Sequence, residues 1–192
     1  MAREPARKPA RRERSGVTAR RVVLTGPEAS GKTTLAIALA AQFGAAWTPE
    51  AARLYAESST APLSAATVEP IARLAIALED ALLTASPGPE LLVRDTDLIS
   101  TVVYARHYYG NAAPWIVAES RARLGDLYLL CAPDLPWSAD GVRDRPTQRE
   151  ELFQAFRATL TEFGAPTIEI RGSGPPRLRA AISAVEALRR GA

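Results

Sequence analysis

The sequence contains very little of what a disulfide framework, a zinc centre or a membrane span requires. Its 192 residues include one cysteine, Cys131, and one histidine, His107. A single residue of each kind excludes an intrachain disulfide, a four-cysteine zinc site and a His-pair metal site. No apolar run reaches the roughly 20 residues of a membrane helix, and no apolar stretch follows the basic N-terminus as in a secretory signal. We therefore expect a cytoplasmic protein without a membrane partner.

Lysine is also scarce, and the basic charge is unevenly distributed. Residues 1–21 hold eight basic and two acidic side chains, whereas the rest of the chain holds sixteen basic and nineteen acidic ones. The larger part is mildly acidic, so a nucleic-acid-binding face is not indicated there. Residues 1–19 are rich in Arg, Pro and Ala without apolar periodicity, which predicts a disordered basic tail. This tail is either a solvated extension or a contact for RNA, DNA or acidic partners.

Short apolar runs alternate with amphipathic segments along residues 20–192, and we predict one domain there. The alternation favours a parallel sheet covered by helices on both faces. The predicted fold is α/β, a three-layer sandwich with a five-stranded parallel sheet, helices on both faces and a short lid at 134–146. Strands are expected at 21–25, 45–48, 91–95, 127–130 and 167–170, and helices at about 34–43, 49–57, 64–84, 97–109, 114–124, 152–163 and 178–188.

The most informative motif is GPEASGKT at residues 26–33, which fits G-x-x-x-x-G-K-[ST] between an expected strand and an expected helix. Its glycines let the backbone turn and point N–H groups at phosphate oxygens. Lys32, one of only two lysines, is expected at the β- and γ-phosphates, and Thr33 at Mg²⁺. The predicted three-layer sandwich is therefore that of a P-loop NTPase, and the predicted cofactors are ATP and Mg²⁺. The predicted nucleotide-binding residues of this segment are Gly26, Glu28, Ala29, Ser30, Gly31, Lys32, Thr33 and Thr34.

Acidic side chains follow two expected strands. Asp95 ends the third strand, where a Mg²⁺-supporting carboxylate is expected, and Asp97 either faces the substrate or caps the next helix. Glu50 and Arg53 follow the second strand. Glu50 is a candidate proton acceptor and Arg53 a candidate substrate contact, with an exposed i,i+3 ion pair as the alternative.

Three arginines follow Trp137 in the expected lid region, with Arg143 the best candidate for a catalytic and nucleotide-binding role. Guanidinium groups from a closing segment stabilise a phosphoryl group in transfer, although a solvated charged loop has the same composition. Trp137 and Tyr104 are candidates for stacking on a planar base, or simply for packing. The other two arginines of the group are Arg145 and Arg149.

Four segments in the same order resemble the ribosylnicotinamide kinase domain of NadR-type proteins, a branch of the P-loop nucleoside and nucleotide kinases. They are GPEASGKTTLA (26–36), PEAAR (49–53), RDTDLISTVVYA (94–105) and LYLLCAPDLPWSADGVRD (127–144). The resemblance implies ATP-dependent phosphorylation of the 5′-hydroxyl of nicotinamide riboside in NAD salvage. One departure is Ala51, which stands where the family often has an aromatic residue.

The resemblance also implies roles for individual residues. Gly31, Lys32 and Thr33 are implied as phosphate and Mg²⁺ contacts, Asp95 and Asp97 as active-site carboxylates, Glu50 and Arg53 as substrate-side groups, and Arg143 as the lid arginine. Two alternatives stay open: a kinase for another nucleoside or nucleotide, and a non-kinase ATP-binding regulatory ATPase that uses the basic tail. The sequence does not indicate an oligomeric state.

Overall fold

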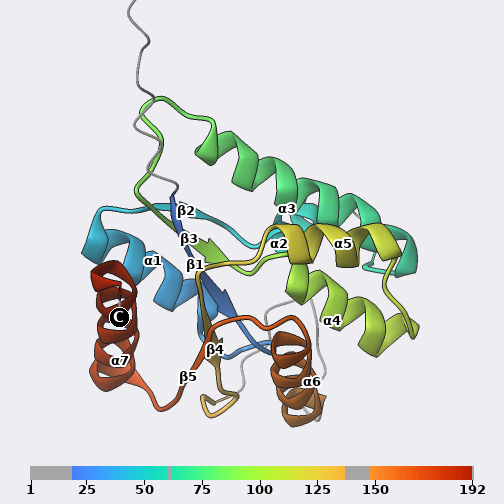
Figure 1. The fold of residues 1–192 in the computed structure, drawn as a ribbon. Helices are drawn as coiled ribbons and strands as arrows, with labels where there is room; N and C mark the ends of the chain where they lie inside the picture. Colours follow the sequence, from blue (N-terminus) through green and yellow to red (C-terminus); the bar gives the residue numbers. More distant parts are fainter. Residues whose placement is uncertain (1–18, 60–61, 137–147, 192) are drawn as a thin grey trace, which may run out of the picture.

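The computed structural model describes residues 19–59, 62–136 and 148–191. Most of the predicted tail lies outside these residues, as do Trp137, Arg143, Arg145 and most of the predicted lid. The described core is a sheet of five parallel strands in the order β2-β3-β1-β4-β5 (Figure 1). The strands are β1 (Arg20–Thr25), β2 (Ala46–Thr48), β3 (Leu91–Asp95), β4 (Leu127–Cys131) and β5 (Thr167–Ile170).

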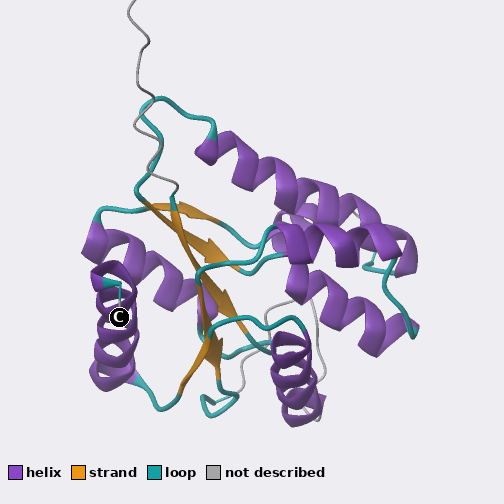
Figure 2. Cartoon of the chain, viewed as in Figure 1, coloured by secondary structure: helices purple, strands orange, loops and turns teal. Residues whose placement is uncertain are grey.

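Helices cover both faces of this sheet, which confirms the predicted fold class (Figures 1 and 2). Helices α1 (Lys32–Phe43) and α7 (Gly174–Arg190) lie together on one face. The other face carries α3 (Val68–Leu83), α4 (Leu98–Tyr109), α5 (Pro114–Ala122) and α6 (Arg149–Glu162), and α2 (Ala51–Ser58) packs against α3. Among the described helices, none combines the length and apolar character of a membrane span.

Alternating side chains on the central strands build two separate apolar layers. Leu127 and Leu129 of β4 pack with α1 and α7, whereas Tyr128 and Leu130 of the same strand pack with α4 and α6. All five β4 residues are buried, as expected for a parallel strand covered on both sides. The sheet therefore holds its carboxyl edge rigidly between two cores.

Several helix starts, including those of α1, α6 and α7, differ from the sequence prediction by two to four residues. Helix α1 begins at Lys32 rather than at 34, because Gly31 adopts a left-handed conformation (φ 75°) and serves as the N-cap. The long helix expected from residue 64 begins with a 3₁₀ turn, Ala65–Thr67, before α3. Here the Thr67 hydroxyl accepts from the Ser64 N–H (3.0 Å) and donates to the Ser64 carbonyl (2.8 Å), which fixes the turn.

A buried cluster of charges lies between the sheet and α3. Glu79 is fully buried, and its carboxylate lies 3.2 Å from Arg94, 3.2 Å from Arg123 and 3.4 Å from Arg21. Arg94, on the interior strand β3, is itself only 2% exposed. Removing the shared carboxylate would leave the buried Arg94 guanidinium without its ion-pair partner, so this contact anchors α3 to the sheet.

We expect Glu79→Gln to lower the free energy of unfolding by about 3 kcal/mol, since breaking a buried ion pair from one side typically costs about 3–5 kcal/mol. Glu69→Gln, which removes an exposed ion pair with Arg73, is the matched control and should change stability by less than about 1 kcal/mol. Urea denaturation with an unchanged m-value measures both. Equal effects of the two substitutions would contradict a structural role for the cluster.

Candidate active site

The loop from Gly26 to Gly31 turns tightly at the carboxyl end of β1. Gly26 (φ 131°), Ala29 (φ 49°) and Gly31 (φ 75°) all have positive φ, and Ala29 does so without the freedom of glycine. A Cβ atom on Gly26 would lie 2.5 Å from the Cys131 carbonyl oxygen. The loop backbone is thus pressed against the end of β4, and this position requires glycine.

Polar side chains of the loop are turned inward. Lys32 Nζ donates to the Pro27 carbonyl oxygen (2.8 Å), and Ser30 Oγ donates to the same oxygen (2.7 Å). Lys32 is 8% exposed, and Glu28 is buried with neither carboxylate oxygen hydrogen-bonded. Thr34, the last predicted nucleotide-binding residue, is exposed on α1. The loop therefore places a buried cation within a tight backbone turn.

Asp95 lies beside the start of α1, as its place at the end of β3 predicts. Its Oδ2 accepts a hydrogen bond from the Thr33 hydroxyl (2.5 Å), whereas its buried Oδ1 has no hydrogen-bond partner. Burial raises the pKa of Asp95, and the positive charge of Lys32 acts in the opposite direction. The structure thus brings together the two side chains predicted to bind a metal ion.

Asp97 caps α4 and is also part of the site. Its Oδ1 accepts from the Ile99 N–H (2.9 Å) and its Oδ2 accepts from the Tyr128 hydroxyl (2.6 Å). The Tyr128 oxygen in turn accepts from the Gly125 N–H (3.1 Å), so its proton points at Asp97. Burial raises the pKa of Asp97, against the effect of the Arg94 charge. The predicted helix cap is confirmed, and Asp97 also lines the pocket described below, whereas its role toward a substrate stays a prediction.

Glu50 and Arg53 lie at the start of α2. The Glu50 carboxylate is 4.0 Å from the Arg53 guanidinium, with side-chain exposures of 12% and 34%. Both charges act on the pKa of Asp95, Glu50 raising it and Arg53 lowering it. The two residues therefore form the predicted i,i+3 pair and also lie within electrostatic range of the metal-site candidate.

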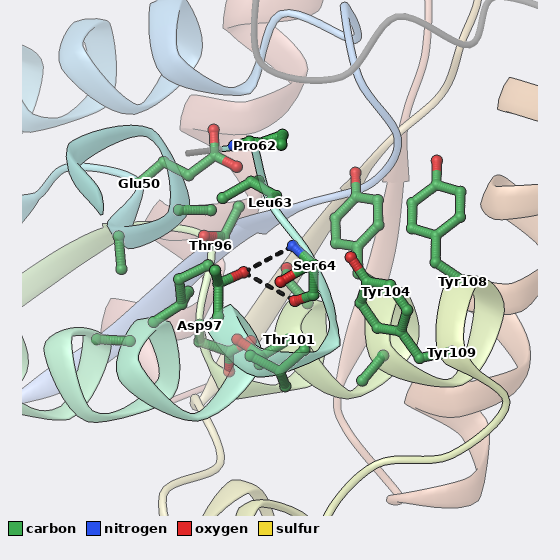
Figure 3. Close-up of a pocket in the computed structure, with 18 residues that line it drawn as sticks. Glu50, Pro62, Leu63, Ser64, Thr96, Asp97, Thr101, Tyr104, Tyr108 and Tyr109 are labelled. Carbon is green, nitrogen blue, oxygen red and sulfur yellow. Dashed lines mark hydrogen bonds between the residues drawn. The ribbon is translucent and has the colours of Figure 1, made fainter. Parts of the chain in front are cut away.

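A pocket of about 340 Å³ opens between α2, the start of α3 and α4 (Figure 3). Glu50 and Asp97 line it, together with three tyrosines of α4. Tyr104 and Tyr108 stack with their ring centroids 6.0 Å apart. The eighteen described lining residues include no Lys, Arg or His. Its hydroxyl-bearing residues are Ser64, Thr67, Thr96, Ser100, Thr101, Tyr104, Tyr108 and Tyr109.

Sequence reasoning missed two residues that support the site and misjudged a third. In the sequence, Tyr128 resembles one more apolar residue of a buried strand. Arg177 resembles an ordinary charged residue of the terminal helix. Arg149 was grouped with the lid arginines, but the structure places it, buried, at the first position of α6.

Comparison with known proteins identifies the family. The family model for the AAA domain matches residues 21–177. The chain belongs to this AAA domain family. No curated protein sequence matches the chain significantly.

Solved structures share the fold of this AAA domain. NadR protein in complex with NR superposes with a TM-score of 0.77 at 23% identity, covering 88% of this chain and 50% of NadR. NadR with NAD and AMP-PNP gives a TM-score of 0.76 at 23% identity, covering 88% and 49%. Thymidylate kinase from Candida albicans gives 0.64 at 13% identity, covering 90% and 92%. The chain thus spans about half the length of NadR, and the predicted resemblance is confirmed in fold and family.

The buried Asp95 carboxylate leads to a stability prediction. Its native pKa lies above the usual value of 3.8, so the folded state holds this proton more tightly than the unfolded state. This contribution to stability is present at low pH and is lost as the pH rises through the native pKa. We therefore expect Asp95→Asn to be more stable than the wild type at pH 7, with a difference that shrinks toward pH 4.

Thermal unfolding across this pH range measures the effect, with Glu90→Gln at an exposed position as the control. A variant that is less stable than the wild type at pH 7 would show that the carboxylate is kept for its contribution to the fold.

Proposed function

We propose that this AAA domain is a small-molecule kinase that transfers the γ-phosphoryl group of ATP to a hydroxyl of a nucleoside, with nicotinamide riboside as the acceptor. The observation that carries the proposal is a pocket lined by two carboxylates and by no basic residue among its described lining, within electrostatic range of the P-loop. The likeness in fold to NadR in complex with NR supports the choice of acceptor.

The proposed triphosphate site is the P-loop itself. Successive backbone N–H groups in a turn with left-handed residues form a concave anion site, and the N-terminus of α1 adds its dipole. In this proposal Lys32 exchanges the Pro27 carbonyl for oxygens of the β- and γ-phosphates. Because Lys32 is buried where the local dielectric is low, its attraction for a phosphate oxygen is stronger than it would be in water.

The residues at the start of α1 fit a magnesium ion. The Thr33 hydroxyl and Asp95 Oδ1, a buried oxygen without a hydrogen-bond partner, are the hard donors that Mg²⁺ prefers. No group of three or more acidic, His or Cys side chains in the described chain forms a metal cage, and Mg²⁺ commonly uses one carboxylate together with substrate phosphates. When bound, the ion would offset the charge that develops on the transferred group.

Charge in the pocket favours a cationic or neutral acceptor. Nicotinamide riboside carries a positive pyridinium ring, which Glu50 attracts and which the tyrosine faces of α4 stabilise through cation–π contact. The phosphate of a nucleoside monophosphate would instead be repelled by Glu50 and Asp97. Ala51, in the lining, contributes no ring, so the aromatic surface of the described pocket comes from α4.

We assign the proton-accepting role to Glu50. Both oxygens of Asp97 already accept hydrogen bonds, so Asp97 is held to orient a substrate hydroxyl. Arg53, beside Glu50, is proposed to bind the phosphate of the phosphorylated product. Arg143 and Trp137 lie outside the described residues, and their roles stay predictions.

A nucleotide kinase is the second candidate. It is favoured by Arg53, a guanidinium near the site, and by the fold shared with thymidylate kinase. It requires a cation at the acceptor phosphate inside the pocket, where the described lining has none.

The acceptor prediction can be tested with a pair of substrates that differ only in charge. Nicotinamide riboside is cationic, and its reduced form has a neutral ring of nearly the same shape. We expect the wild type to phosphorylate the cationic form with a lower KM, and Glu50→Gln to reduce this preference about tenfold, or ~1.4 kcal/mol. A loss of the proton acceptor lowers kcat for both substrates, so the ratio of KM values isolates the charge effect.

Thymidine monophosphate, thymidine and inosine complete the panel. Phosphorylation of the monophosphate in preference to every nucleoside would favour the second candidate and exclude the first. ATP hydrolysis without any phosphorylated acceptor would favour the regulatory ATPase.

Lys32→Ala should lower kcat/KM at least 10²-fold, because it removes a charge aimed at the transferred phosphoryl group. Lys8→Ala, at the only other lysine, is the matched control and should keep wild-type turnover. Phosphoryl-transfer assays and thermal unfolding of both variants separate lost chemistry from lost fold. Nearly unchanged transfer in a folded Lys32→Ala protein would overturn the kinase proposal.

A further inference from the structure

Two buried arginines donate hydrogen bonds to backbone carbonyls of the P-loop. An Arg149 Nη donates to the Ala29 carbonyl oxygen (3.1 Å), and an Arg177 Nη donates to the Ser30 carbonyl oxygen (2.6 Å). The two guanidinium groups come from the first turns of α6 and α7, far from the loop in sequence. Two consecutive peptide groups of the loop are therefore hydrogen-bonded by arginine side chains from two different helices.

Each arginine also donates a hydrogen bond to a second backbone segment. The other Nη of Arg149 donates to the Leu135 carbonyl (3.2 Å), and that of Arg177 donates to the Gly172 carbonyl (2.8 Å) and lies 3.2 Å from Asp134. The exposures of 9% and 5% leave both side chains little freedom. The P-loop is thus tied to the segments that follow β4 and β5.

The direction of these hydrogen bonds determines where the loop amides point. In a planar trans peptide the C=O and N–H bonds point in opposite directions. The Ala29 carbonyl bound by Arg149 therefore turns the Ser30 N–H away from Arg149. In the same way, the Ser30 carbonyl bound by Arg177 turns the Gly31 N–H away from Arg177. A phosphate site requires loop N–H groups that are fixed in direction, so that they converge on the anion.

The same contacts offset local strain, and among the described residues they leave the charge of Arg149 without a carboxylate partner. Ala29 adopts φ 49°, a conformation that costs a non-glycine residue free energy unless its surroundings enforce it. Charge-assisted hydrogen bonds from guanidinium groups are among the stronger means of enforcing it. Within the described residues, Arg149 has only carbonyl oxygens as hydrogen-bond acceptors, so no carboxylate there neutralises it.

We propose that Arg149 and Arg177 are positioning residues that pre-organise the phosphate site by fixing the 29–30 and 30–31 peptide groups. Both act through the loop backbone, Arg149 acts also through its charge, and neither needs to touch the nucleotide. The proposal rests on the proposed function only in that the P-loop binds a polyphosphate. It concerns affinity for that polyphosphate and makes no demand on the acceptor.

The experiment measures binding of inorganic tripolyphosphate with Mg²⁺ to the full chain by calorimetry. We expect Arg149→Gln and Arg177→Gln each to weaken the affinity about tenfold or more, and Arg149→Lys to recover part of the loss, since lysine restores charge without the two-armed bridge. Arg157→Gln, also on α6 but half-exposed and paired with Glu169, is the matched control with wild-type affinity.

Steady-state kinetics give a second measurement. The KM for ATP should rise in both variants while the KM for the acceptor stays constant, a split that general loosening of the fold would not produce. If Arg177→Gln fails to fold, Arg149→Gln decides alone. Folded variants with wild-type tripolyphosphate affinity, or a wild type that does not bind tripolyphosphate, would overturn the proposal. A wild type that binds tripolyphosphate but phosphorylates no acceptor would contradict only the kinase function.

Discussion

The close approach of Gly26 to the carbonyl oxygen of Cys131 is the constraint on which the rest of the site depends. It is possible because β1 lies at the centre of the sheet, between β3 and β4, with Leu24 in register with both Asp95 and Leu129. That register brings the carboxyl ends of three strands to one edge. The P-loop, the Asp95 carboxylate and the segment that carries Asp134 and Leu135 consequently meet there.

The site combines several features that are unfavourable for the fold alone. Asp95 is buried with one carboxylate oxygen that accepts no hydrogen bond, and Glu28 is buried with both carboxylate oxygens unpaired. Ala29 has a left-handed backbone conformation. Two apolar layers and the ion cluster around Glu79 hold the surrounding elements firmly enough to maintain these features. Stabilised scaffolds commonly retain local strain and unpaired polar groups where function needs them, and here they gather around the proposed phosphate site.

The sequence predicted what depends on local spacing and missed what depends on topology. The P-loop, the five strands and the place of Asp95 follow from motifs within a few residues of one another. Tyr128 contacts Asp97 from 31 residues further along the chain. Arg177 contacts Ser30 from 147 residues further along. Nothing in their own neighbourhoods distinguishes them from packing or solvated residues. Arg149 shows the reverse error, because its nearness in sequence to the lid arginines suggested a role that its buried contact with Ala29 does not share.

Charge is divided across this edge of the sheet in a way that separates the proposed donor and acceptor. Lys32, Arg149 and Arg177 surround the P-loop, whereas Glu50 and Asp97 line the neighbouring pocket. A polyphosphate is attracted to the first region and repelled by the second. A cationic nucleoside has the opposite preference, so neither ligand competes well for the other's place. In the proposed kinase, Thr33 and Asp95 stand at the boundary that the transferred group would cross, and this division of charge would keep the phosphate donor and the cationic acceptor in separate places.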